Sequence, residues 1–168
     1  MYVTFRVADR TDLSRLEVMD LKTFDLSWDY QFWESALNTL TVRIALSGFG
    51  SVGFWVAQKI PATEDTPMRI DILKIGVPPV YQRQGIGRAI LNDIRHWLGY
   101  TVNSREQCEV RLQVPESMFE PGFGTSPKDW LNKHGFMLAK PPVIYSPETY
   151  RLYGKVFKDI YLYSFPRY

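Results

Sequence analysis

The chain has 168 residues, a length within the range of one domain and sufficient to bury a sizeable core. Its 20 Lys+Arg and 18 Asp+Glu residues leave a net charge of +2, which indicates neither a nucleic acid nor an anionic membrane as partner. The lone cysteine, Cys108, excludes an intrachain disulfide and a cysteine-cluster zinc site. No apolar run approaches the length of a membrane span, so we expect a cytoplasmic protein. The two histidines, His96 and His134, are not at metal-ligand spacing, so no bound metal is expected.

The first half of the chain predicts a strand, two helices and a hairpin. Residues 2–7 alternate well enough for a strand, and a hairpin of strands 41–45 and 51–59 is indicated by Gly-Phe-Gly between them. Two helices are expected over 11–24 and 28–40. The first would be capped by Thr11 or Asp12, with an apolar side of Leu13, Leu16, Val18 and Leu21.

The second half of the chain predicts strands at 70–77 and 109–114 around a central helix that begins near residue 86. That helix has an apolar stripe at helical spacing, made of Ile86, Ile90, Ile94, Trp97 and Leu98. A short helix is expected over 127–134, and two further strands near the C-terminus, the last at about 159–164.

The connection between strand 70–77 and the central helix has the composition of a phosphate-binding loop. Pro78 and Pro79 end the strand, since proline cannot donate to a sheet ladder, and Gly85-x-Gly87 opens the helix. Bare backbone amides and the positive end of the helix dipole then point at one place, which favours a phosphate there. A dinucleotide fingerprint is excluded because Ile90 stands at its third glycine, and no Walker A loop is present.

Residues 72–98 resemble the acetyl-coenzyme A loop of the GNAT superfamily of N-acetyltransferases, whose signature is [Gln/Arg]-x-x-Gly-x-[Gly/Ala]. Gln82, Gly85 and Gly87 occupy the signature positions, and the predicted order of elements resembles that of the family over nearly the whole chain. The resemblance implies an α/β (α+β) fold: a single domain over residues 1–168, with a central, mostly antiparallel mixed sheet. That sheet would be splayed at the coenzyme site and flanked by about four helices.

The resemblance also implies acetyl-CoA as cosubstrate. Backbone amides of the loop would bind its pyrophosphate, and the end of the preceding strand would present backbone groups to the pantetheine arm. Arg88 would add charge to a phosphate, whereas Arg83 has a solvated surface arginine as an equal alternative. The implied cofactor-binding residues are Ile75, Gly76, Val77, Gln82, Arg83, Gln84, Gly85, Ile86, Gly87 and Arg88.

Two acidic residues are candidates for catalysis. Asp71 lies eleven residues before Gln82, resembling in offset the catalytic glutamate of the histone-acetylating branch of the family. Its apolar neighbours would raise its pKa towards that of a useful general base. The alternative is a strand aspartate that faces water or pairs with Arg69 or Lys74. Glu116 follows strand 109–114, near the place where acceptors enter in this family.

The general acid departs from the family pattern, because Leu131 stands where many members have tyrosine and Met118 where many have asparagine. These substitutions leave open a tyrosine from elsewhere in the chain, water as the acid, or no catalysis. On the loop resemblance, the favoured function is an N-acetyltransferase that moves acetyl from acetyl-CoA to a primary amine. The alternative is a non-catalytic acetyl-CoA-binding or protein-interaction module. The sequence leaves open whether the amine belongs to a small molecule or a protein, and whether the chain forms a homodimer.

Overall fold

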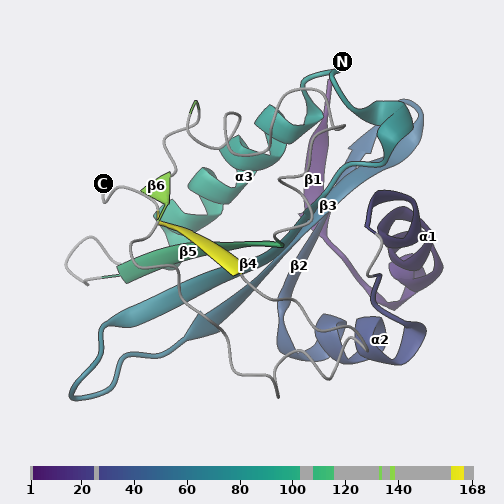
Figure 1. Ribbon diagram of the computed structural model, residues 1–168. Coiled ribbons are helices and arrows are strands. Elements are labelled where there is room, and N and C mark those ends of the chain that lie inside the picture. Colours follow the sequence, from purple (N-terminus) through teal and green to yellow (C-terminus); the bar gives the residue numbers. More distant parts are fainter. Residues whose placement is uncertain are drawn as a thin grey trace. The chain divides into compact units, whose positions relative to one another are not determined.

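The computed structural model describes residues 2–24, 27–102, 108–115, 133, 137–138 and 160–164 of the chain (Figure 1). The chain divides into two compact units, one of Met1–Lys59 with Ile72–Glu106 and the other of Ile60–Asp71 with Gln107–Tyr168. Strand β4, Met68–Gly76, contributes residues to both. Each unit has its own antiparallel strand pairs.

The first unit contains three strands that precede β4 in both sequence and sheet order. β1 (Thr4–Val7) pairs with β2 (Thr41–Ser47), which pairs with β3 (Gly50–Ile60), and both pairs are antiparallel. The register of the second pair shifts between Ala45 and Leu46, beside the turn that joins its strands. The predicted hairpin is confirmed, with strands longer than the sequence indicated.

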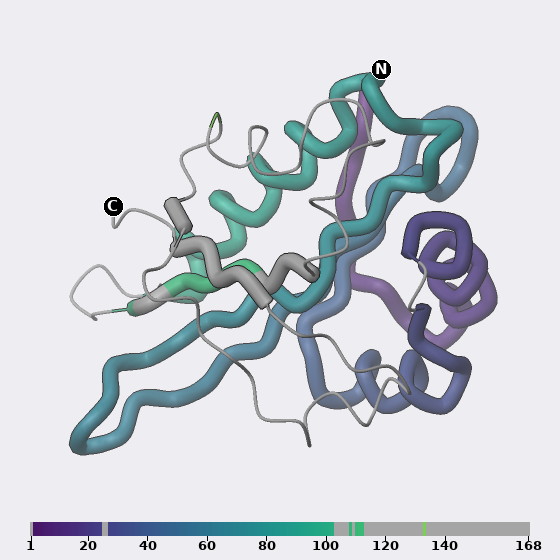
Figure 2. The backbone as a smooth tube through the Cα atoms, in the orientation of Figure 1, coloured from purple at the N-terminus to yellow at the C-terminus, as the bar shows by residue number. Residues whose placement is uncertain are grey.

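Three α-helices cover the two faces of these strands (Figure 1). On β3, Phe54 packs edge-on against Trp33, and the next residue, Trp55, packs edge-on against Trp97. Since successive strand residues point to opposite faces, the helices carrying these two tryptophans lie on opposite sides. Figure 2 shows the same arrangement of α1 (Leu13–Thr23) and α2 (Tyr30–Thr39) on one side and α3 (Ile86–Thr101) on the other.

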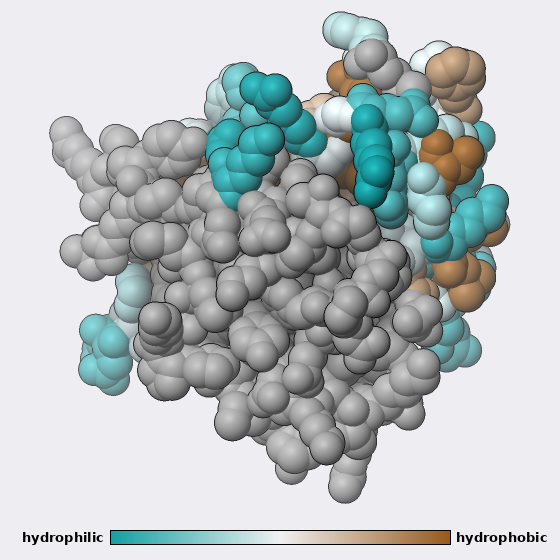
Figure 3. Space-filling model, turned by 45° about the horizontal axis from the view of Figure 1, so that its top comes forward, coloured by the Kyte–Doolittle hydropathy of each residue, from teal (hydrophilic) through white to brown (hydrophobic). Residues whose placement is uncertain are grey.

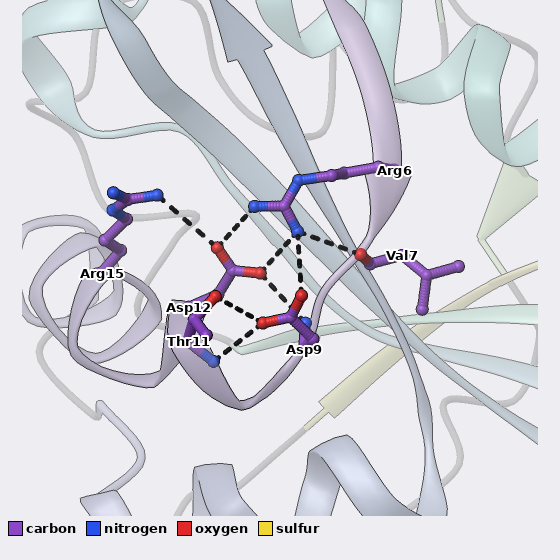
Figure 4. Close-up of polar contacts among 6 residues, drawn as sticks. All are labelled: Arg6, Val7, Asp9, Thr11, Asp12 and Arg15. Carbon is purple, nitrogen blue, oxygen red and sulfur yellow. Dashed lines mark hydrogen bonds and ion pairs between the residues drawn. The ribbon is translucent and has the colours of Figure 1, made fainter.

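The start of α1 is fixed by a polar cluster that reaches it from β1 (Figure 4). Arg6 donates through both terminal nitrogens to the buried carboxylate of Asp12, at 2.7 Å each. The cap is formed one turn earlier than predicted. Asp9 accepts from the Thr11 amide at 2.8 Å and caps a short 3₁₀ turn, η1 (Arg10–Asp12), while Asp12 makes no side-chain cap of α1 itself.

The apolar side of α1 was predicted in part wrongly. Leu13 and Leu16 are buried, but Val18 and Leu21 are 47% and 61% exposed. The buried side of the helix continues instead through Met19 and Asp20. Because Asp20 is charged, a search for apolar residues at helical spacing does not find it. On the part of the surface that Figure 3 colours by hydropathy, hydrophobic and hydrophilic side chains are intermixed.

The second unit has the strand order β4-β5-β7-β6. β5 (Cys108–Pro115) pairs antiparallel with β7 (Ile160–Ser164), and β6 (Met137–Leu138) pairs with β7 from its other side. The strands predicted over 109–114 and 159–164 are confirmed. The helix predicted over 127–134 lies outside the described residues apart from Lys133, so three α-helices are described where about four were expected.

Candidate active site

The candidate site begins where β4 ends. Pro78 adopts an extended conformation, with φ −53° and ψ 145°, and Pro79 opens a 3₁₀ turn, η2 (Pro79–Tyr81). The Tyr81 amide donates to the Pro78 carbonyl at 2.8 Å, which closes the turn. The prolines therefore end the ladder and reverse the chain, as their missing donors and fixed φ predict.

The signature glutamine ties the loop back to the strand. Gln82 Nε2 donates to the Val77 carbonyl at 2.9 Å, across the η2 turn. Gln84 Nε2 repeats the pattern on the Val80 carbonyl at 3.0 Å. The Val77 carbonyl lies between β4 and η2, and the Val80 carbonyl lies within η2 itself, so the two amide side chains hold the loop in one shape.

The backbone turns sharply before α3. Arg83 and Gly85 both lie in the left-handed region, with φ of 60° and 84°. Gly85 is the N-cap of α3, and the helix has no side-chain cap because glycine carries no acceptor. The amides of the first helical turn, Ile86 to Arg88, therefore have no cap side chain in front of them, which suits a bound anion.

The helix behind these amides is anchored to the sheet. The predicted stripe is buried at Ile86, Ile90, Ile94 and Leu98, and Leu91 joins it, whereas Arg88 is exposed. Asp93 accepts from Arg43 Nε at 2.8 Å and Nη2 at 2.9 Å, and from Trp55 Nε1 at 2.9 Å. These bonds from two strands fix the rotation of α3, and so the direction of its N-terminus.

The end of β4 lies unusually close to β3. A Cβ built on Gly76 would lie 2.3 Å from the Phe54 ring, and one built on Gly53 would lie 2.9 Å from the Gly76 carbonyl oxygen. Both positions require glycine because real Cβ atoms do not approach so closely. Phe54 itself is fully buried, so the ring cannot move out to solvent.

Asp71 is buried, with 3% of its surface exposed. Arg69 Nε lies 3.0 Å from its Oδ1 and donates to Oδ2 at 3.2 Å. Oδ1 makes no hydrogen bond to a described residue. Of the two partners that the sequence left open, Arg69 is the one observed, because the Lys74 ammonium lies instead on Asp20.

The pair of Asp20 and Lys74 was missed from the sequence. Lys74 Nζ contacts both oxygens of the Asp20 carboxylate, at 2.5 and 2.7 Å. Burial lowers the pKa of Lys74 to about 8, although the Asp20 carboxylate opposes the shift. Burial also raises the pKa of Asp20 above its ordinary value. The two residues are 54 positions apart in the sequence, so no local pattern marks such a pair.

Several predicted features stay outside what the structure tests. Glu116, Met118 and Leu131 lie outside the described residues. Among the described residues, no group of three His, Cys, Asp or Glu could hold a metal ion. None of the described helices is long and apolar enough to cross a membrane.

Several solved structures share this fold. The ribosomal-protein-S18-alanine N-acetyltransferase from Escherichia coli is 20% identical, with a TM-score of 0.70 over 98% of this chain and 94% of that one. Arabidopsis thaliana NAA60 in complex with acetyl-CoA is 21% identical, with a TM-score of 0.69 over 98% of both chains. Arabidopsis thaliana Naa50 with a bisubstrate analogue is 19% identical, with a TM-score of 0.67 over 99% and 100%.

Sequence comparison adds no closer relative, since no protein-family model and no curated protein matches the chain. The structural identities are low, so the likeness shows the fold. A protein of the GNAT family from Desulfovibrio desulfuricans is among the similar structures, with a TM-score of 0.68. The chain therefore has the fold of the GNAT N-acetyltransferases, and the fold class predicted from the loop motif is confirmed.

Proposed function

We propose that this chain, which has the GNAT fold, is an acetyl-CoA-dependent N-acetyltransferase acting on a primary amine. One observation carries the proposal most directly: the glycine-capped N-terminus of α3, directly after the loop closed by Gln82. Its uncapped amides suit a pyrophosphate, and the exposed Arg88 supplies positive charge beside them. Three of the similar structures contain CoA, acetyl-CoA or a CoA bisubstrate analogue, which supports the same ligand here.

In the proposed site, the end of β4 and the loop that follows it would bind different parts of the coenzyme. Ile75, Gly76 and Val77 would offer backbone groups to the pantetheine arm at the end of β4. Residues 82–88 would bind the phosphates, with Arg83 and Arg88 as the charged side chains. The close approach of β3 at Gly53 and Gly76 keeps this backbone in a fixed position.

The proposed reaction joins the acceptor nitrogen to the acetyl carbon. The neutral amine attacks the thioester carbonyl, the N–C bond forms, the C–S bond breaks, and the thiolate leaves. Asp71 is the candidate base that takes the ammonium proton, and its Oδ1, which has no hydrogen bond from a described residue, is the acceptor atom. The attached nitrogen then loses its second proton, which passes through water to the departing thiolate because no tyrosine stands at residue 131, and Asp71 releases the first proton to solvent.

The alternative is a coenzyme-binding module without catalysis. The contact of Arg69 with the Asp71 carboxylate favours it, because the guanidinium lies on the group that would have to receive the proton. Leu131 and Met118 in place of the usual tyrosine and asparagine favour it as well. The single domain over 1–168, the cytoplasmic location, the homodimer and the identity of the amine stay predictions.

Calorimetric titration of acetyl-CoA into the wild type and Gly87→Glu tests the coenzyme site. The variant places a carboxylate at the first turn of α3, where it would repel a phosphate, so binding is expected in the wild type and lost in the variant. Gly99→Glu is the matched control: it makes the same charge change at the far end of the helix, in open space, and is expected to bind as the wild type does. Absence of binding by the wild type would contradict the proposal.

A further inference from the structure

A cross-strand pair on β2 and β3 holds the middle of α3. Arg43 and Trp55 are direct partners in the antiparallel ladder, so their side chains leave the same face of the sheet. Arg43 donates to both oxygens of the Asp93 carboxylate, through Nε at 2.8 Å and Nη2 at 2.9 Å. Trp55 Nε1 donates to the same carboxylate at 2.9 Å. One side chain of the helix therefore accepts three directional bonds from two strands.

Trp55 contacts the helix a second time, one turn later. Trp97, four residues after Asp93, packs edge-on against the Trp55 ring, with the ring centres 5.2 Å apart. Residues four apart are neighbours on a helix surface, so both contacts fall on one face of α3. The ion pair is largely shielded from water, since the side chains of Arg43 and Asp93 are 20% and 12% exposed.

Nearer its N-terminus, α3 rests on the backbone of β3. Gly53 lies two residues before Trp55 and so faces the same side of the sheet. A Cβ built on Gly53 would lie 3.2 Å from Ile90 Cδ1 and 3.4 Å from Ile86 Cγ2. These contacts are apolar, and apolar contact is not directional. They set the distance of the helix from the sheet, whereas the bonds to Asp93 also set its rotation.

Stability gives no reason for a charged pair in this place. Apolar side chains of similar volume often replace a buried ion pair without loss of stability. A bidentate arginine–carboxylate pair adds a fixed distance and orientation instead, because the planar guanidinium binds both oxygens at once. The pair of Arg43 and Asp93 is therefore best explained by the orientation that it gives to α3.

We propose that Arg43 and Asp93 are positioning residues for the coenzyme, which act by setting the direction of the uncapped amides at the N-terminus of α3. The inference rests on the proposed function. Asp93 lies five residues after Arg88, so the pair holds the helix about 8 Å along its axis from the proposed phosphate site. Over so short a length the helix moves as one body, and a rotation at Asp93 turns the amides away from a bound phosphate.

Calorimetric titration of acetyl-CoA into folded Arg43→Met/Asp93→Asn tests the positioning role. This variant removes both charges and the bidentate contact, while the asparagine oxygen still accepts from Trp55. The Kd for acetyl-CoA should rise at least about tenfold, because hydrogen bonds to a phosphate weaken when their donors are misaligned. A pair that served stability alone would lower the midpoint of urea unfolding and leave the Kd of the folded protein unchanged. An unchanged Kd would overturn the proposal.

Arg10→Met/Glu34→Gln is the matched control. It removes the same two charges from an ion pair of 2.7 Å between η1 and α2, and it should bind acetyl-CoA as the wild type does. Arg43→Lys is a milder variant, which answers the question even if the double variant fails to fold. It keeps the charge but has no planar fork, so its Kd should rise at least about threefold. A wild-type Kd in Arg43→Lys would count against the proposal in the same way.

Hydrogen exchange in the protein without ligand tests the orientation of the helix by itself. The Ala89 amide donates to the Gly85 carbonyl at 3.0 Å and so reports on the first turn of α3. In Arg43→Met/Asp93→Asn it should exchange at least about fivefold faster than in the wild type. The Trp33 amide, which closes the first turn of α2 on the Asp29 carbonyl, should keep its rate. Equal Ala89 rates in the two proteins would overturn the proposal.

The two measurements separate this inference from the proposed function. Failure of the wild type to bind acetyl-CoA would overturn the proposed function, and the coenzyme role of the pair with it. The exchange result would still decide whether Arg43 and Asp93 hold the first turn of α3. Binding by the wild type with a wild-type Kd in both variants would leave the proposed function standing and overturn the positioning role alone.

Discussion

At the scale of single residues, the site requires glycine at two positions where a side chain would not fit or would strain the backbone. Gly76 has no side chain because the Phe54 ring occupies that space, and Gly85 has none because its φ of 84° disfavours a Cβ. The sequence does not distinguish the two glycines, although they are required for different reasons. One permits close packing of strands, and the other permits a left-handed turn before α3.

Gly76→Ala should destabilise the protein by about 1–3 kcal/mol, the usual cost of overpacking a filled core. The Cβ would lie 2.3 Å from the buried Phe54 ring, so ring or strand must move. Urea unfolding of Gly76→Ala, Phe54→Leu and the double variant measures the effect. The double variant should be more stable than the sum of the single effects predicts, since the smaller side chain releases the clash. Strict additivity would show that the ring is not the obstacle.

Alanine should have opposite effects at two glycines of the α3 segment. Gly85→Ala should cost about 1–2 kcal/mol, because an L-residue is strained at that positive φ. Gly99→Ala should gain about 0.5–1 kcal/mol, because Gly99 lies within the helix in open space and alanine orders it at lower entropic cost. Thermal unfolding of both variants checks the pair. A gain at residue 85 would contradict the left-handed cap.

At the scale of elements, the strands and the central helix were largely predictable, and the polar contacts between elements were not. The stripe of α3 and the proline-ended strand are local patterns, and the observed α3 and β4 follow them closely. Asp20 was missed because its partner lies on another element, so nothing near it in the sequence marks it as buried. The sequence left two partners open for Asp71 for the same reason, and only the fold selects Arg69.

The start of α1 gives an element-scale prediction in acid. The hydrogen bonds from Arg6 hold the pKa of Asp12 below its ordinary value, so this carboxylate stabilises the fold above that value and the contribution is lost as the pH falls through the lowered pKa. Arg6→Met should cost about 1–2 kcal/mol at pH 7, allowing for solvent screening of the partly exposed guanidinium. Urea unfolding across acidic pH should show the two proteins converging. An equal difference at all pH values would refute the assignment.

At the scale of the whole molecule, the loop motif and the overall fold both indicate the same family of structures. The loop motif predicts a GNAT fold, and the similar structures have that fold over nearly the full chain. The acceptor was not predictable in the same way. Its site depends on side chains from elements far apart in the sequence, and the positions of the usual acid carry Leu131 and Met118, which lie outside the described residues.

The most direct measurement is acetyl transfer itself, with purified wild-type protein, acetyl-CoA carrying a labelled acetyl group, and three probe amines: an N-terminally free peptide, a lysine peptide and spermidine. We expect at least one amine to become labelled, with one free thiol released for each acetyl group transferred, and Gly87→Glu to show neither product. Binding of acetyl-CoA with no labelled amine in the probes or in a cell lysate would contradict an acetyltransferase and favour the non-catalytic coenzyme-binding module.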